Sequence, residues 1–284
     1  MLESVDLVLF GIEFDLHIVL YVIHTHQATI IRSVLKPFPL PNVTVPMQYA
    51  TPALRHPLIT AFEEFVRDPL FPCVGAKAAL SKRQMTYVIA RDIRSAWDDL
   101  RVHEMIVDLV ALYRKNPAPF RSLAVIFEDD TEIDEVGFEQ LLWQRVQSLS
   151  DKDDWLGQKP DDRVAHDPNH PEFSVSFGGE AFFIVGLHPQ ASRPARQFVR
   201  PTMIFNLHDQ FERLREANQY EKLKSSILER DVKIAGTINP MLAGHGTVSA
   251  ARQYSGRAVG SEWRCPYARA GTHPDQELLR AVNN

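Results

Sequence analysis

Cysteine is scarce in this sequence. The chain of 284 residues has only two cysteines, Cys73 and Cys265. They lie far apart and form no Cys-x-x-Cys pair, so we expect neither a disulfide scaffold nor a structural zinc site. This usage is typical of a protein of the reducing cytoplasm, where we expect the chain to work.

Several motifs that carry common chemistry are also missing. The sequence has no Gly-x-Gly-x-x-Gly, no P-loop, no Gly-x-Ser-x-Gly and no His-Glu-x-x-His. A nucleotide-binding or hydrolytic function therefore has no motif to support it. Internal repeats and low-complexity tracts are absent as well.

The chain has no excess of basic charge and no uninterrupted apolar segment. Lys and Arg number 31 against 36 Asp and Glu, which gives a net charge of −5. Nucleic-acid-binding surfaces usually need a basic excess, so we expect no nucleic-acid partner. The apolar run over residues 5–24 is interrupted by Asp6, Glu13 and Asp15, which are too costly to insert into a bilayer. We expect no membrane partner either.

The sequence predicts an N-terminal extension followed by one domain. Residues 1–50 end in a linker with prolines at Pro37, Pro39, Pro41 and Pro46, a pattern typical of extended chain. Residues 51–284 are long enough to bury a large core of their own. Their hydrophobic content, 45% over the whole chain, is that of an ordinary globular protein.

Hydrophobic periodicity predicts an α+β fold. Apolar residues at helical spacing predict helices over 56–69, 93–115 and 134–150, the second of them capped by Asp92. Residues 84–91 and the nearly all-apolar 122–129 read as strands, the latter inside the sheet. Gly178-Gly179 between two β runs predicts a hairpin over 173–187. A short strand at 202–206 follows, with Asn206 capping a helix over 207–218. The order indicates a single domain with a mixed, mostly antiparallel sheet flanked by helices.

Three arginines recur at short spacing after the predicted hairpin. The segment "SRPARQFVRP" places Arg193, Arg196 and Arg200 at i, i+3 and i+7. Pro194 suits a first helical turn and Pro201 discourages helix at Arg200, so we interpret the segment as one short helix with its guanidinium groups on one side. Such groups bind carboxylates, including the propionates of haem. A solvated basic surface is the alternative.

Three histidines stand at positions suited to ligand contact. His188 follows a predicted strand, His208 lies in the first turn of a predicted helix, and His245 lies in the glycine-flanked "AGHG". Each imidazole is able to ligate iron, and each is also explained as a hydrogen-bonded structural histidine. Cys73 in "FPCVGAKAAL" is a further candidate iron ligand, although its apolar neighbours favour burial in a core.

Five segments, in one order, resemble a known family. They are "FVRDPLFPCVGAKAAL", "FSVSFGGEAFFIVGLHPQASRPARQF", "MIFNLHDQFERLR", "INPMLAGHG" and "ARQYSGRAVGSEWRCPY". Together they resemble the YqcI/YcgG family over about residues 56–267. That family includes haem-dependent N-hydroxylases that act on guanidino compounds in guanitoxin biosynthesis and on L-arginine in D-cycloserine biosynthesis.

The resemblance implies a haem b mono-oxygenase of natural-product or antibiotic biosynthesis. Such an enzyme uses O₂ and hydroxylates a guanidino group, here with L-arginine as the expected substrate. The sequence shows no flavin or nicotinamide site, so electrons are expected from an external donor. A haem-binding sensor or carrier without turnover is the alternative, and whether the chain forms a homodimer stays open.

The resemblance also suggests site residues. His208, slightly ahead of His188, is the expected iron ligand. The cofactor would further contact the three arginines, His245, and the "YSGR" segment with Tyr254 and Arg257, which would close over the substrate. A guanidinium needs a carboxylate partner. The nearest acidic residues to these motifs are Glu180, Asp209 and Glu212.

Overall fold

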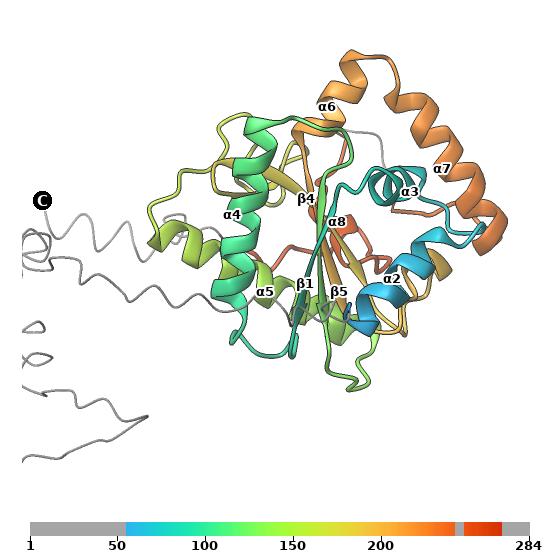
Figure 1. Cartoon of the computed structure of the whole chain (residues 1–284), viewed down its shortest axis with the longest axis horizontal. Coiled ribbons are helices and arrows are strands. Elements are labelled where there is room, and N and C mark those ends of the chain that lie inside the picture. The colour runs from blue at the N-terminus through green and yellow to red at the C-terminus, as the bar shows by residue number, and fades with distance from the viewer. Residues whose placement is uncertain (1–54, 242–246, 269–284) are drawn as a thin grey trace, which may run out of the picture. The chain divides into compact units, whose positions relative to one another are not determined.

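The computed structural model describes residues 55–241 and 247–268 (Figure 1). The predicted N-terminal extension over residues 1–50 lies outside them. The described residues form seven α-helices and one five-stranded mixed sheet, which confirms the predicted α+β class. In this part of the chain, no helix has the length and apolar character needed to cross a membrane.

The sheet has the strand order β1-β2-β5-β4-β3. Of its four strand pairs, β1 with β2 is parallel and the other three are antiparallel. All six residues of β2 are buried, and the strand is flanked by β1 and β5, as its apolar sequence predicts. The strands are β1 (Met85–Ala90), β2 (Ser122–Phe127), β3 (Val175–Phe177), β4 (Glu180–Leu187) and β5 (Thr202–Leu207).

The predicted hairpin is present between β3 and β4. Gly178 and Gly179 both have positive φ, 58° and 80°, and Phe177 pairs with Glu180 across the turn. Two successive positive φ values define a type I′ turn, which glycine adopts without steric cost. The turn sets the register of β4 and places Glu180 at its start.

One face of the sheet is fully covered. The helices α4 (Asp99–Lys115), α5 (Glu135–Trp155) and α8 (Ala251–Tyr254) supply residues to the large core against this face. Strands alternate their side chains between faces. Phe182 and Ile184 of β4, and Phe205 of β5, accordingly lie in this core with no exposed surface.

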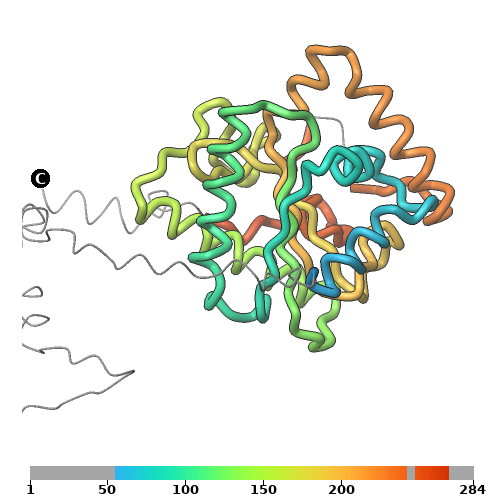
Figure 2. The backbone as a smooth tube through the Cα atoms, in the orientation of Figure 1, coloured from blue at the N-terminus to red at the C-terminus, as the bar shows by residue number. Residues whose placement is uncertain are grey.

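The other face of the sheet is covered less completely. A smaller apolar cluster packs there beneath α2 (Pro57–Arg67), with partly buried residues of α3 (Val74–Ser81) around it. The alternate residues Phe183, Val185 and Ile204 are only half-buried. Beyond lie α6 (Asp209–Glu216) and α7 (Tyr220–Ala235), and α7 contacts α3, α6 and the short 3₁₀ helix η1 (Pro194–Arg196). In Figures 1 and 2, α7 lies on the side of the sheet away from α4.

Two predicted helix caps are wrong. Helix α4 begins at Asp99 rather than near residue 93, because Asp92 accepts the backbone N–H of Arg94 in a turn that precedes the helix. The side chain of Asn206 does not cap α6. It accepts a hydrogen bond from Ser122 Oγ at 2.7 Å and donates one to the carbonyl of Phe183, because strand alternation points it across the sheet.

Candidate functional site

Two adjoining cavities lie on the less covered face of the sheet. The first has a volume of about 280 Å³ and the second about 220 Å³. Both are lined mainly by apolar side chains and share four residues: Phe183, Phe211, Leu223 and Ile227. We call the two together the cleft. Their joint volume falls within the range of about 300–1,000 Å³ that is usual for small-molecule sites.

The first cavity contains polar atoms that lack a partner. Arg193 donates from Nη2 to Asp231 Oδ2 at 2.5 Å and to the carbonyl of Thr237 at 3.0 Å, but its buried Nε has no hydrogen-bond partner among the described residues. The side chain of Gln210 is on the same cavity wall, and its Oε1 is also buried without a partner. An apolar cavity with one spare donor and one spare acceptor suits a ligand that has both polar groups.

The three arginines of the sequence motif do not share one side. Only Pro194–Arg196 form a helical turn, a 3₁₀ turn too short to align them. Arg196 lines the first cavity and donates to the carbonyl oxygens of Gly186, Gln253 and Tyr254. Its burial lowers the pKa of its guanidinium to about 10. Arg200 lines neither cavity and lies 3.8 Å from Asp130. The structure therefore brings Arg193 and Arg196 to the cleft, and not Arg200.

Cys73 lies on the wall of the first cavity. It occupies the N-cap of α3, where its Sγ accepts the backbone N–H of Ala76 at 3.4 Å. Burial raises the pKa of the thiol, while backbone hydrogen bonds and the charge of Arg196 act in the opposite direction. A sulfur at a helix N-terminus beside a cationic group is a suitable setting for a metal-binding thiolate.

His208 lies on the wall of the second cavity and makes hydrogen bonds with both ring nitrogens. Its Nδ1 is 3.0 Å from Ser174 Oγ, and its Nε2 is 2.9 Å from Glu212 Oε1. Glu212 comes one helical turn after His208 and also pairs with Arg215. The ring of His208 is thus held by two partners, and either bond would have to break before that nitrogen bound a metal.

His188 lies in a different environment. Its side chain is completely buried and stacks on Phe138 with the ring centroids 4.4 Å apart. Neither ring nitrogen has a hydrogen-bond partner among the described residues, and the residue lines neither cavity of the cleft. Burial lowers the pKa of the imidazole to about 4, so the ring is neutral at pH 7.

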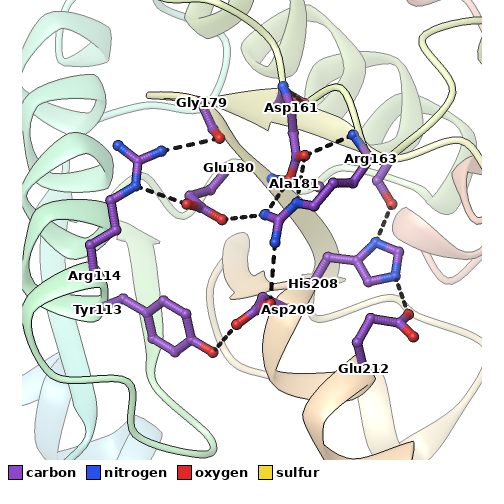
Figure 3. Close-up of polar contacts among 12 residues, drawn as sticks. Tyr113, Arg114, Asp161, Arg163, Gly179, Glu180, Ala181, His208, Asp209 and Glu212 are labelled. Carbon is purple, nitrogen blue, oxygen red and sulfur yellow. Dashed lines mark hydrogen bonds and ion pairs between the residues drawn. The ribbon is translucent and has the colours of Figure 1, made fainter. Parts of the chain in front are cut away.

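All three predicted substrate carboxylates are already paired with arginines of the chain, Glu212 with Arg215 and the other two in one network. Figure 3 shows the guanidinium of Arg163 between Glu180 and Asp209, at 2.6 Å and 3.2 Å. Arg114 also donates to Glu180, and Tyr113 donates its hydroxyl proton to Asp209. Neither Glu180 nor Asp209 lines the cleft.

The same network lowers the pKa values of Asp161 and Asp209. Burial alone would raise the pKa of Asp209, but hydrogen bonds from Arg213 and Tyr113 and the charge of Arg163 outweigh it and lower the pKa. Asp161 holds Arg163 from the other side with two hydrogen bonds and accepts the N–H of Ala181 (Figure 3). The network ties the loop before β3 to the start of β4.

The remaining predicted residues are apart from the cleft or outside the described chain. Tyr254 is fully buried in the large core, where its hydroxyl donates to the carbonyl of Phe182 at 3.0 Å. Arg257 pairs with Glu139 of α5, with Nε 2.8 Å from Oε2. Neither Tyr254 nor Arg257 lines a cavity of the cleft. His245 lies outside the described residues.

Sequence reasoning missed Gln210 and Asp231, two buried polar residues on the wall of the first cavity. Asp231 lies on α7, a helix not predicted from the sequence. Gln210 is the second residue of α6, a helix that the sequence predicts, but the lack of a partner for its Oε1 depends on the tertiary structure. Within residues 55–241 and 247–268, no group of three or more His, Cys, Asp or Glu side chains is arranged to hold a metal ion.

These features define an α+β protein with an apolar cleft on one face of its sheet. The model of the YqcI/YcgG family matches residues 62–268, and the chain belongs to that family. The match includes every element from β1 to α8 and all residues of the cleft. No curated protein and no solved structure matched the chain.

Proposed function

We propose that the protein is a haem-dependent mono-oxygenase that hydroxylates a guanidino nitrogen, with L-arginine as its substrate. The observation that carries the proposal is the cleft: an apolar site of suitable volume, with side chains able to ligate iron and two partly buried arginines on its walls. The resemblance of the sequence segments to guanidino N-hydroxylases supplies the reaction. The cleft supplies a place for it.

The residues of the cleft fit a haem. Its apolar walls suit a flat hydrophobic ring, and the spare Nε of Arg193 suits an acidic group of the cofactor or substrate. Two residues on the walls are able to ligate iron, Cys73 and His208. We favour Cys73 because its sulfur accepts hydrogen bonds only from the backbone at the start of α3, whereas both nitrogens of His208 are held by side chains. A thiol that coordinates a metal ion loses its proton despite a raised pKa.

Haem would supply the site of O₂ activation, with electrons from an external donor. Overall, one oxygen atom enters a guanidino N–H bond and the other leaves as water, with two electrons and two protons consumed. The chain's own contribution is to exclude water and to orient the guanidino group. Phe183 and Phe211 border both cavities, and we expect their apolar rings to exclude water.

Turnover tests this proposal directly. The full-length protein, loaded with haem and supplied with a chemical reductant and O₂, should convert L-arginine to Nω-hydroxy-L-arginine, detected by mass spectrometry as the gain of one oxygen atom. Omitting O₂ should abolish the product. If the haem-loaded protein neither binds nor consumes any guanidino compound, it is a haem carrier or sensor instead.

A further inference from the structure

The cleft contains one buried acceptor that the protein leaves unused. Gln210 is only 2% exposed, yet its Oε1 has no hydrogen-bond partner among the described residues, and the side chain lines the first cavity. A buried polar atom is normally paired, so an exception on a cavity wall indicates a partner that arrives with the ligand. That partner must donate an N–H or O–H group.

Asp231 is a second acceptor on the wall of the same cavity. It is 6% exposed and pairs with Arg193 through a single guanidinium nitrogen, Nη2. The Nε of Arg193 is left over. This nitrogen is placed to donate to an acidic group of a ligand. Asp231 accepts from Arg193 with Oδ2, and the other lone pairs of its carboxylate are available to a cation.

We propose that Gln210 and Asp231 form the subsite that receives the guanidino group, while Arg193 receives the substrate's carboxylate. This inference rests on the proposed function and names the residues that would select its substrate. A guanidinium has five N–H donors and no acceptor, so it requires a neighbouring carboxylate and further oxygen acceptors. An amide oxygen next to a carboxylate meets that requirement.

Other acidic residues near the cleft are less suited to this role. Glu180 and Asp209 already hold the guanidinium of Arg163 and do not line the cleft (Figure 3). Glu172 lines the second cavity but is exposed to solvent, where an ion pair contributes little. Asp231 is the buried carboxylate on the walls of the cleft.

The test is calorimetric titration of the haem-loaded, full-length protein with three probes. L-arginine has both charged groups, agmatine lacks the carboxylate, and L-citrulline replaces the guanidinium with an uncharged ureido group. The wild-type protein should bind L-arginine most tightly and the other two at least tenfold more weakly. The variants Gln210→Met and Asp231→Asn should each lose at least tenfold in affinity for L-arginine. Glu229→Gln, an exposed change on the same helix as Asp231, should retain the wild-type affinity.

A stability measurement separates binding from folding. Met has nearly the volume of Gln and no unpaired acceptor, so ligand-free Gln210→Met should melt at the wild-type temperature or above it. Asp231→Asn removes the charge that pairs with the partly buried Arg193, so this variant is the one at risk of not folding. In that case the affinity of Gln210→Met for L-arginine alone tests the subsite. Unchanged affinity for L-arginine in Gln210→Met would overturn the subsite while leaving the proposed function intact. Failure of the haem-loaded wild type to bind any of the three probes would overturn the proposed function itself.

Discussion

Acidification should reveal the buried imidazole of His188. In the folded protein, its burial lowers the pKa to about 4, from an ordinary value of 6.5. The charges of Glu135 and Asp134 oppose this shift and that of Arg196 adds to it. Because the folded pKa is depressed, the unfolded chain binds a proton first as the pH falls. The stability that His188 contributes is therefore complete above pH 6.5 and is lost between pH 6.5 and pH 4.

The magnitude follows from the size of the shift. The full difference in pKa corresponds to roughly 3 kcal/mol, of which about 2 kcal/mol should be lost between pH 7 and pH 5. Carboxylates with lowered pKa values, such as Asp161 and Asp209, also destabilise the protein on acidification. The measurement is therefore a difference between two proteins: urea unfolding of the wild type and of His188→Leu, each at pH 7 and pH 5.

A leucine side chain cannot titrate, so the His188→Leu variant should lose about 2 kcal/mol less than the wild type over this interval. The wild type and the variant share all other titrating groups, so their contributions cancel. Equal losses in the two proteins would refute the reasoning. They would mean that the imidazole of His188 is hydrated or hydrogen-bonded in solution, contrary to its stacking on Phe138.

Two further predictions concern packing and the iron ligand. Gly186→Ala should lower the free energy of unfolding by about 1–3 kcal/mol in urea titrations, because the added Cβ would lie 2.7 Å from Leu142 Cδ1. Gly260→Ala, where a Cβ meets nothing within 4 Å, should have no such effect, and equal stabilities would contradict the packing. Cys73→Ala should abolish the thiolate-type absorption of the ferrous CO complex. If the wild-type spectrum is instead of the histidine type and is lost in His208→Ala, then His208 and not Cys73 is the iron ligand.

Several elements of the fold could be predicted from sequence because their signals are local. The β2 run is apolar throughout, the Gly178-Gly179 turn requires positive φ, and the apolar spacing of α2 is helical. The limits of α4 could not be predicted, since Asp92 and Asp98 offer competing hydrogen bonds to nearby backbone and side chains. Short-range competition of this kind decides helix ends more than periodicity does.

The candidate site was less predictable because it depends on which residues meet in space. The spacing of Arg193 and Arg196 predicts that they share one helical face. In the structure each is instead held at the cleft by its own hydrogen bonds, Arg193 by Asp231 and Arg196 by backbone carbonyls. Glu180 and Asp209 are acidic residues within the segments that resemble the family, but only the tertiary structure shows that Arg163 lies between them. The unpaired state of Gln210 is likewise a property of the folded chain.

The central claim is that the cleft binds haem, and absorption spectroscopy of the purified full-length protein tests it most directly. The wild type should show a Soret band, as purified or after titration with haem, that saturates at a stoichiometric amount. Val185→Trp, which places a large side chain in the first cavity from β4, should remain folded and lose the band. A wild-type protein that stays colourless after haem is added would contradict the account, and so would a Val185→Trp variant that binds haem as tightly as the wild type.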